Sequence, residues 1–211
     1  DKLLSIGNPH VWDKDYDLKS DFLTIFTKND SGVALGNVTL IQKNQTINAD
    51  KIEYIKDSKN NGVSYIASGN VVIKDSSRTS TCGKAIYNRN DETTVLEIEP
   101  KIIDKDQILS GSKIVLNYHD ENLKKLNISK NAEAITSFQG YKNINRDSLS
   151  LMDTLKFENK IQGNKMTSFF DKGNLDFIRV EGMAKTLYHV FEDSIYKGKN
   201  NSSGDTIVMS F

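Results

Sequence analysis

Histidine and cysteine, the side chains most often used for metal binding and nucleophilic catalysis, are few and scattered in this 211-residue chain. His10, His119 and His189 are separated by 109 and 70 residues, and none has a cysteine or carboxylate at the spacing of a zinc site. The single cysteine, Cys82, excludes an intramolecular disulfide and is typical of a small buried apolar side chain. The sequence therefore predicts no metal ion and no cofactor.

Signatures of nucleotide binding and hydrolysis are missing from the sequence as well. It contains no Gly-x-Ser-x-Gly, Walker or Gly-x-Gly-x-x-Gly motif. The many carboxylates leave a polysaccharide lyase or hydrolase on a β-solenoid open as a minor alternative, because the separation of a catalytic pair is a three-dimensional property. Lys plus Arg and Asp plus Glu balance at 28 each, which argues against a nucleic-acid partner. We predict a protein that is not an enzyme.

The elements that would position any site are short alternating runs of apolar and polar residues. Val38 and Leu40 alternate with polar neighbours, and so do Ile178 and Val180; this period of two is typical of β-strands. Sustained helical periodicity is absent, and 149–157 also favours a strand. No run of 18 or more apolar residues occurs, so no helix is expected to span a membrane. The sequence predicts an all-β protein.

Clusters of Asn, Asp, Lys, Ser and Gly between these runs predict the turns. The predicted turns are 43–45, 57–62, 75–77, 88–92, 104–106, 119–122, 139–145, 171–173 and 192–205.

An internal repeat indicates how the strands are arranged. Residues 34–54 align without a gap with residues 67–87, at an offset of 33. A second relation at an offset of 52 pairs Gly111 with Gly163 and Ala132 with Ala184. Sequential repeats favour hairpins that stack on their neighbours into an elongated double sheet. A closed β-sandwich with Greek-key crossovers is the alternative.

The repeat carries a more specific pattern. It reads Ala34-Leu-Gly-Asn-Val38, then Ala49-Asp-Lys-Ile-Glu-Tyr54, then Ala67-Ser-Gly-Asn-Val71. This series resembles the OstA-like (LptA-type) lipopolysaccharide-transport family, which includes the N-terminal domain of LptD, and the later segments 159–170 and 178–188 look like the larger OstA-like proteins of the Bacteroidetes type. Two positions depart from the pattern, since Gly83 stands where Asp50 stands and Met183 replaces an expected Asn.

The resemblance implies an elongated open β-jellyroll (β-taco) of stacked antiparallel hairpins. It implies a single domain over residues 1–211, a fragment of a longer chain. It also implies a periplasmic location, lipopolysaccharide as a partner through its lipid A acyl chains, and bridge partners that are LptC-like or LptD-like jellyrolls or further copies of the chain.

In such a jellyroll the inward-facing aliphatic side chains would contact the acyl chains. The predicted lipid-binding residues are Val38, Leu40, Ile47, Ile52, Val71, Ile73, Ile114, Leu116, Leu126, Ile128, Ile178 and Val180. The predicted partner edge is Ile207, Met209 and Phe211, because the last strand of an open stack leaves backbone groups free for strand addition. A structural or adhesive β-repeat protein that adds strands without binding lipid is the second hypothesis.

Overall fold

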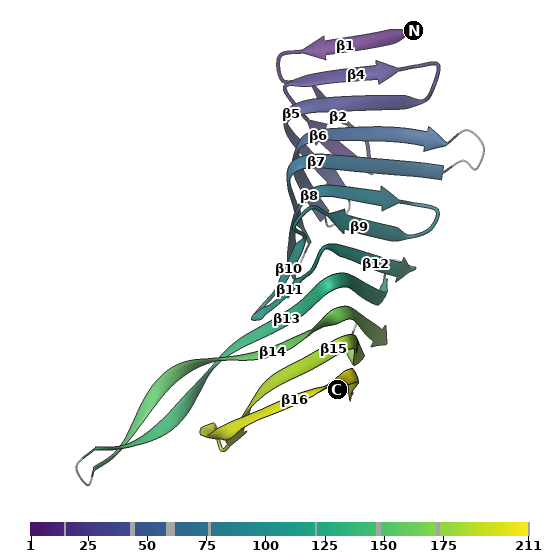
Figure 1. Cartoon of the computed structure of the whole chain (residues 1–211). Helices are drawn as coiled ribbons and strands as arrows, with labels where there is room; N and C mark the ends of the chain where they lie inside the picture. The colour runs from purple at the N-terminus through teal and green to yellow at the C-terminus, as the bar shows by residue number, and fades with distance from the viewer. Residues whose placement is uncertain are drawn as a thin grey trace.

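The chain forms one long antiparallel sheet that is bent along its length (Figure 1). The computed structural model describes residues 1–14, 16–42, 45–57, 62–75, 77–120, 122–146, 149–171 and 174–210. These residues form sixteen strands and no helix. The all-β prediction is confirmed.

The strands lengthen toward the C-terminus, where β13 has 25 residues and β14 has 23. Their bounds are β1 Lys2–Ile6, β2 His10–Trp12, β3 Tyr16–Lys19, β4 Phe22–Phe26, β5 Ser31–Gln42, β6 Gln45–Asp57, β7 Gly62–Lys74, β8 Arg78–Asn88, β9 Thr93–Glu97, β10 Lys101–Asp104, β11 Gln107–Ser110, β12 Lys113–His119, β13 Asn122–Arg146, β14 Leu149–Asp171, β15 Asn174–Glu192 and β16 Ile195–Ser210.

Neighbours in sequence are neighbours in the sheet. The main path runs β4-β5-β6-β7-β8 and later β13-β14-β15-β16, with antiparallel pairing throughout. No Greek-key crossover occurs among the described strands, so the stacked-hairpin prediction is confirmed and the sandwich alternative is wrong.

The sheet consists of two layers that share their long strands. Each long strand changes register partway along its length and continues in the other layer; Figure 1 shows β5–β8 bending in this way. Layer 1 contains β1, β4, β9, β12 and residues 31–35, 51–57, 62–68, 84–88, 122–129, 165–171, 174–181 and 206–210. Layer 2 contains β2, β3, β10, β11 and residues 38–42, 45–49, 71–74, 78–82, 132–146, 149–163, 184–192 and 195–204.

The two layers join along a line, here called the crease. The Gly-Asn pair of the repeated Gly-Asn-Val motif lies on this line. Gly36 and Asn37 have φ angles of 75° and 45°, a left-handed conformation that glycine and asparagine tolerate best. A Cβ atom on Gly36 would lie 2.3 Å from the Asp21 Oδ2 atom. That carboxylate accepts a hydrogen bond of 2.9 Å from Asn37 Nδ2. Gly36 and Asn37 of β5 lie opposite the single residue Asp50 of β6, and this extra residue bends the strand into the second layer.

The same device recurs one repeat later. Gly69 and Asn70 have φ angles of 74° and 45°, and Asn70 Nδ2 donates to Asp50 Oδ2 over 2.9 Å. The Asp of the Ala-Asp-Lys-Ile segment is therefore the acceptor that holds the next crease.

The two departures from the pattern fall on later creases. At Gly83 an added Cβ would lie 2.6 Å from Ile98 Cγ2, and Ile98 itself has a φ of 64°. An apolar contact replaces the Asp–Asn pair there. Met183 follows Gly182 at the point where β15 passes from layer 1 to layer 2. It has a φ of 53° and is 69% exposed.

Two predicted turns are wrong. Residues 139–145 lie inside β13, whose pairing with β14 continues to Arg146 and Leu149. Within 192–205 only 193–194 form a turn, and β16 occupies 195–210. Polar residues dominate both segments, but cross-strand pairing overrides their local turn preference. The predicted turns at 88–92 and 104–106 are confirmed.

Several residues of the other predicted turns lie outside the described residues, namely Lys43, Asn44, 58–61, Ser76, Glu121, Lys172 and Gly173. In the part of the chain that is described, no helix is long and apolar enough to cross a membrane.

Candidate functional site

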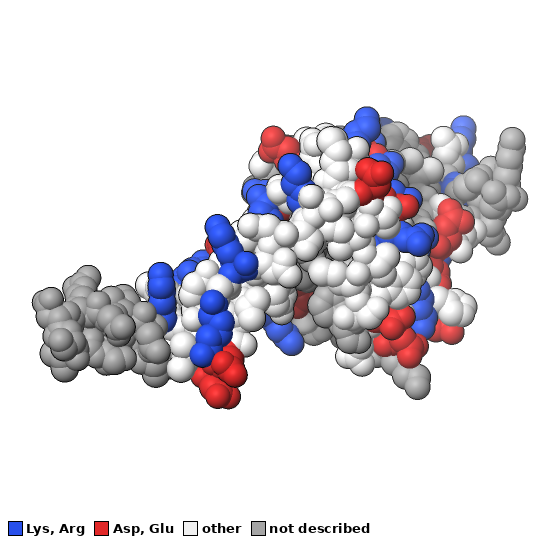
Figure 2. Space-filling model, turned by 60° about the horizontal axis from the view of Figure 1, so that its bottom comes forward, with Lys and Arg blue, Asp and Glu red and all other residues white. Residues whose placement is uncertain are grey.

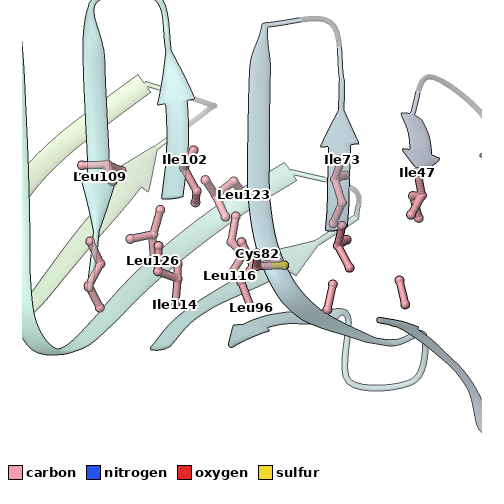
Figure 3. Close-up of a cluster of buried hydrophobic side chains, with 14 of the residues drawn as sticks. Ile47, Ile73, Cys82, Leu96, Ile102, Leu109, Ile114, Leu116, Leu123 and Leu126 are labelled. Atoms are coloured by element: carbon pink, nitrogen blue, oxygen red, sulfur yellow. The ribbon is translucent and has the colours of Figure 1, made fainter. Parts of the chain in front are cut away.

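The space between the two layers is a continuous apolar interior. Its side chains form one cluster that extends from Leu23 in β4 to Ala184 in β15, and Figure 3 shows its central part. Since one period-two face of each layer points inward, every repeat adds aliphatic side chains to the same interior.

All twelve predicted lipid-binding residues lie in this interior. None is more than 7% exposed, and Ile114 and Ile128 are fully buried opposite one another on β12 and β13. Leu40, Ile47 and Ile73 form a row across three strands of layer 2. Burial fits both a filled core and a lipid-facing wall, so lipid binding by these residues stays a prediction.

The sequence reasoning missed other members of the cluster. Leu96, Ile102 and Met166 are 0–1% exposed, and Leu109 and Leu123 are 7–8% exposed. Ile102 and Leu109 belong to strands of four residues, which are too short for alternation to be read with certainty.

Two cavities that described residues border between the layers are small. Each has a volume of about 20 Å³, which is room for about one water molecule. Pockets that hold a drug-sized ligand are about 300–1,000 Å³. An acyl chain can enter either of these two cavities only if the layers move apart there.

Tyrosines of layer 1 cover the interior on the side away from the crease. Tyr54, Tyr65 and Tyr87 stand side by side, with ring centroids 5.5 and 6.2 Å apart. Burial raises the pKa of Tyr65, while its hydrogen bond with the Gln42 side chain lowers that pKa. Burial also raises the pKa of Tyr118, and the nearby Arg78 acts in the opposite direction. Both phenols therefore stay neutral around the interior.

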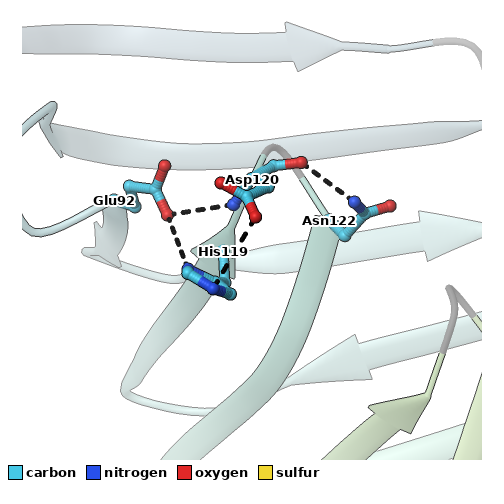
Figure 4. A network of polar contacts seen from close by, with 4 residues as sticks. All are labelled: Glu92, His119, Asp120 and Asn122. Atoms are coloured by element: carbon cyan, nitrogen blue, oxygen red, sulfur yellow. Dashed lines mark hydrogen bonds and ion pairs between the residues drawn. The ribbon is translucent and has the colours of Figure 1, made fainter.

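The cysteine and two of the three histidines lie in separate parts of the described chain. Cys82 is 8% exposed and burial raises the pKa of its thiol to about 11, so it is inert. His119 lies 3.8 Å from Glu92 and 3.7 Å from Asp120 on an exposed turn (Figure 4), and His10 is 3.0 Å from Asp17. Among the described residues no group of three or more His, Cys, Asp or Glu could hold a metal ion.

The third histidine belongs to an aromatic cluster at the outer end of layer 2. His189 packs against Phe157 at 5.3 Å between ring centroids, and Phe157 contacts Phe191 at 4.9 Å and Tyr196 at 5.1 Å. The backbone N–H of Tyr141 donates to the Ser194 carbonyl over 3.0 Å, which brings β16 onto β13. The rings of this cluster are half-buried and join β14, β15 and β16 at this end of layer 2.

The end strands of the sheet have free edges. β1 pairs only with β4 and β2 only with β3 among the described strands, and Leu3, Leu4, Ile6 and Trp12 are 53–66% exposed there. At the opposite end, Ile207 and Met209 of β16 are half-buried against Val180 and Ile178. Phe211 lies outside the described residues.

Charge does not mark a nucleic-acid surface on the face shown in Figure 2, where the described Lys, Arg, Asp and Glu side chains are interspersed and border a broad uncharged area.

Comparison with known proteins identifies a related family. Residues 17–122 match the model of the LptA/(LptD N-terminal domain) LPS transport protein family. No curated protein sequence matches the chain. Among solved structures, the chain is similar to LptH, described as the LptA homologous periplasmic component of the lipopolysaccharide transport device of Pseudomonas aeruginosa, with 16% identity, a TM-score of 0.46, and coverage of 51% of this chain and 79% of LptH.

The family match spans β3 to the start of β13, which includes the Gly36–Asn37 and Gly69–Asn70 bends and part of the core of both layers. This chain belongs to the LptA/(LptD N-terminal domain) LPS transport protein family.

Proposed function

We propose that this chain is a periplasmic component of a lipopolysaccharide transport bridge, and that it holds lipid A acyl chains between its two layers without catalysing a reaction. The observation that carries the proposal is the continuous apolar interior in a chain of this transport family. Other jellyroll components, LptC-like or LptD-like, or further copies of the chain, would join at the free end strands.

Energetics support a carrier of this kind. Each buried methylene contributes about 0.8 kcal/mol, so a chain of about a dozen carbons gains on the order of 10 kcal/mol when it leaves water. A continuous interior can shelter an acyl chain at any position along its length. A discrete pocket would not.

Position-specific photo-crosslinking tests the proposal. A photoreactive amino acid at Leu40, which is 3% exposed, is expected to capture lipopolysaccharide, and so is one at Ile114. Ile41 is the matched control, because it is apolar, adjacent to Leu40 and 41% exposed on the outer face. Labelling of equal yield at Leu40 and Ile41 would contradict an interior lipid site.

The small volume of the two cavities between the layers favours a second candidate function. A structural β-repeat protein that joins partners by strand addition would have small internal cavities, as observed here. That candidate predicts end-to-end oligomers and no lipid capture at Leu40 or Ile114. The same crosslinking experiment separates the two functions, because both allow end-to-end oligomers but only the first predicts lipid capture.

A further inference from the structure

The character of the inward side chains changes with distance from the crease. Along β7 in layer 2, Val71 and Ile73 are buried and apolar, and the turn that follows begins at Asp75. In layer 1 of the same strand, Ala67 lies near the crease and Tyr65 lies further out. The free margins of both layers, here called the rim, are therefore lined by tyrosines and polar side chains.

Side chains from the two layers meet across this rim. Tyr65 of layer 1 is hydrogen-bonded to Gln42 at the end of β5 in layer 2. One of the two cavities is bordered by Tyr65 and Tyr87 on one side and by Leu40 and Gln45 on the other. This arrangement places a phenol and an amide directly over the aliphatic interior.

A second contact lies further along the rim. Tyr118 of layer 1 borders the other cavity together with Asp75 and Arg78 of layer 2. Arg78 Nη2 is 3.2 Å from Asp75 Oδ2, and both side chains are about a quarter exposed. Asp75 Oδ1 also accepts hydrogen bonds from the backbone N–H groups of Ser77 and Arg78, over 3.0 and 2.8 Å. The turn thus presents a preorganised ion pair to the Tyr118 ring.

Polar contacts across the rim can break at low cost when the two layers separate. Phenol, amide, guanidinium and carboxylate groups can exchange their mutual contacts for water at a small net cost, whereas separated aliphatic surfaces cannot. The rings meanwhile keep water away from the aliphatic interior when no lipid is bound, and the amphipathic tyrosine is stable both against the apolar core and in water.

We infer that the contacts of Tyr65 with Gln42 and of Tyr118 with the Asp75–Arg78 pair form a gate along the rim, which separates to admit an acyl chain sideways into the interior. This inference rests on the proposed lipid-carrying function and adds the route by which lipid enters. The sugar portion of the lipid would remain outside the rim, where the polar groups of the open gate can contact it.

A cleavable tether across the rim tests the gate. Gln42→Cys and Tyr65→Cys in one chain are joined by a bismaleimide that contains a disulfide; Cys82, at 8% exposed, is too buried to react. In the control chain, Thr39→Cys and Asn48→Cys are joined by the same reagent. The native Thr39 and Asn48 side chains are hydrogen-bonded over 3.0 Å within layer 2, so this tether leaves the layers free to separate. Loading is followed with fluorescent lipopolysaccharide.

The gate tether is expected to slow loading by tenfold or more relative to the control tether, and a reductant that cleaves the linker should restore the rate. In an untethered chain, Tyr65→Phe with Tyr118→Phe is expected to speed loading by roughly twofold to tenfold, because polar contacts are removed and both rings stay. Equal loading of the two tethered chains would overturn the gate and indicate entry at the ends of the sheet. Failure of the untethered wild-type chain to take up any lipopolysaccharide would instead overturn the proposed function, and the gate with it.

Discussion

At the scale of single residues, Cys82 shows how packing sets the reactivity of a side chain. The sequence predicted Cys82 as a small buried apolar side chain, and this prediction is confirmed by its 8% exposure. Its contacts explain its inertness, since burial outweighs the backbone hydrogen bonds with Lys84 and Glu97 that lower the thiol pKa.

The raised thiol pKa gives a testable pH dependence. The pKa is about 11 in the folded chain, against 9.0 for an ordinary cysteine. Between these values the unfolded state has lost the proton that the folded state retains, so the contribution of Cys82 to the free energy of unfolding falls as pH rises from about 9 to about 11. Comparison of urea unfolding midpoints for wild type and Cys82→Ala across this range measures the effect.

The control for this titration is the region below pH 8, where the stability difference between the two proteins should be constant. Cys82 should also resist alkylation in the folded chain and react once the chain is unfolded in urea. Rapid alkylation of the native protein would contradict the burial of this thiol.

At the scale of elements, the crease is the feature that determines the shape. The Gly-Asn pair supplies two left-handed residues, and the Asp of the preceding strand holds them. The architecture therefore depends on a small number of backbone positions.

Gly69→Ala is expected to destabilise the chain by about 1–3 kcal/mol. The alanine would have to adopt an unfavourable φ of 74°, and its Cβ atom would lie 2.3 Å from Asp50 Oδ2. Gly204→Ala is the control, because the nearest atom to its added Cβ is Thr206 O at 3.7 Å. Chemical denaturation measures both.

The double variant Gly69→Ala with Asp50→Ala separates the two causes. It should recover part of the loss, because the carboxylate that clashes is gone while the unfavourable φ remains. A Gly69→Ala variant as stable as the Gly204→Ala variant would show that the crease tolerates a side chain.

Much of this element-level structure was predictable from the sequence. The repeat and the alternation indicated stacked antiparallel hairpins, and the family pattern indicated an open jellyroll. The crease itself also leaves a signal: the inward residues Ile47 and Ala49 are two apart, but the next one, Ile52, is three further on. This change of spacing from two residues to three marks the bend at Asp50.

Other elements could not be predicted, for physical reasons. The hairpin of β13 and β14 extends through polar segments that resemble turns, and only pairing between the strands keeps them extended. The aromatic cluster brings together Phe157 from β14, Phe191 from β15 and Tyr196 from β16. Rim contacts such as Tyr65 with Gln42 likewise join different layers. Sequence periodicity indicates which residues of one strand share a face, but it does not indicate which strands contact each other.

At the scale of the whole molecule, the free end strands are the expected points of assembly. Unpaired backbone groups of edge strands are templates for strand addition. The exposed Leu3 and Leu4 of β1 and Val208 of β16, at 59%, 53% and 52%, add apolar surface to both ends.

End-to-end association should therefore be concentration dependent, as measured by analytical ultracentrifugation. Leu4→Lys combined with Val208→Lys is expected to weaken self-association about tenfold or more, because each charge would be desolvated at the junction. Ile103→Lys is the control, since Ile103 is 41% exposed and lies on β10, in the middle of the strand order. Association unchanged by the end substitutions would contradict assembly through these strands.

The lateral hydrogen bonding of each layer affects how the interior can widen. Within a layer every strand is tied to its neighbours by an antiparallel ladder, so one strand cannot move outward alone without breaking backbone hydrogen bonds. Rotation about the crease instead moves adjoining strands together, and a change of angle at one repeat is passed to the next. A molecule captured near β4 would thereby widen the passage ahead of it, toward β16.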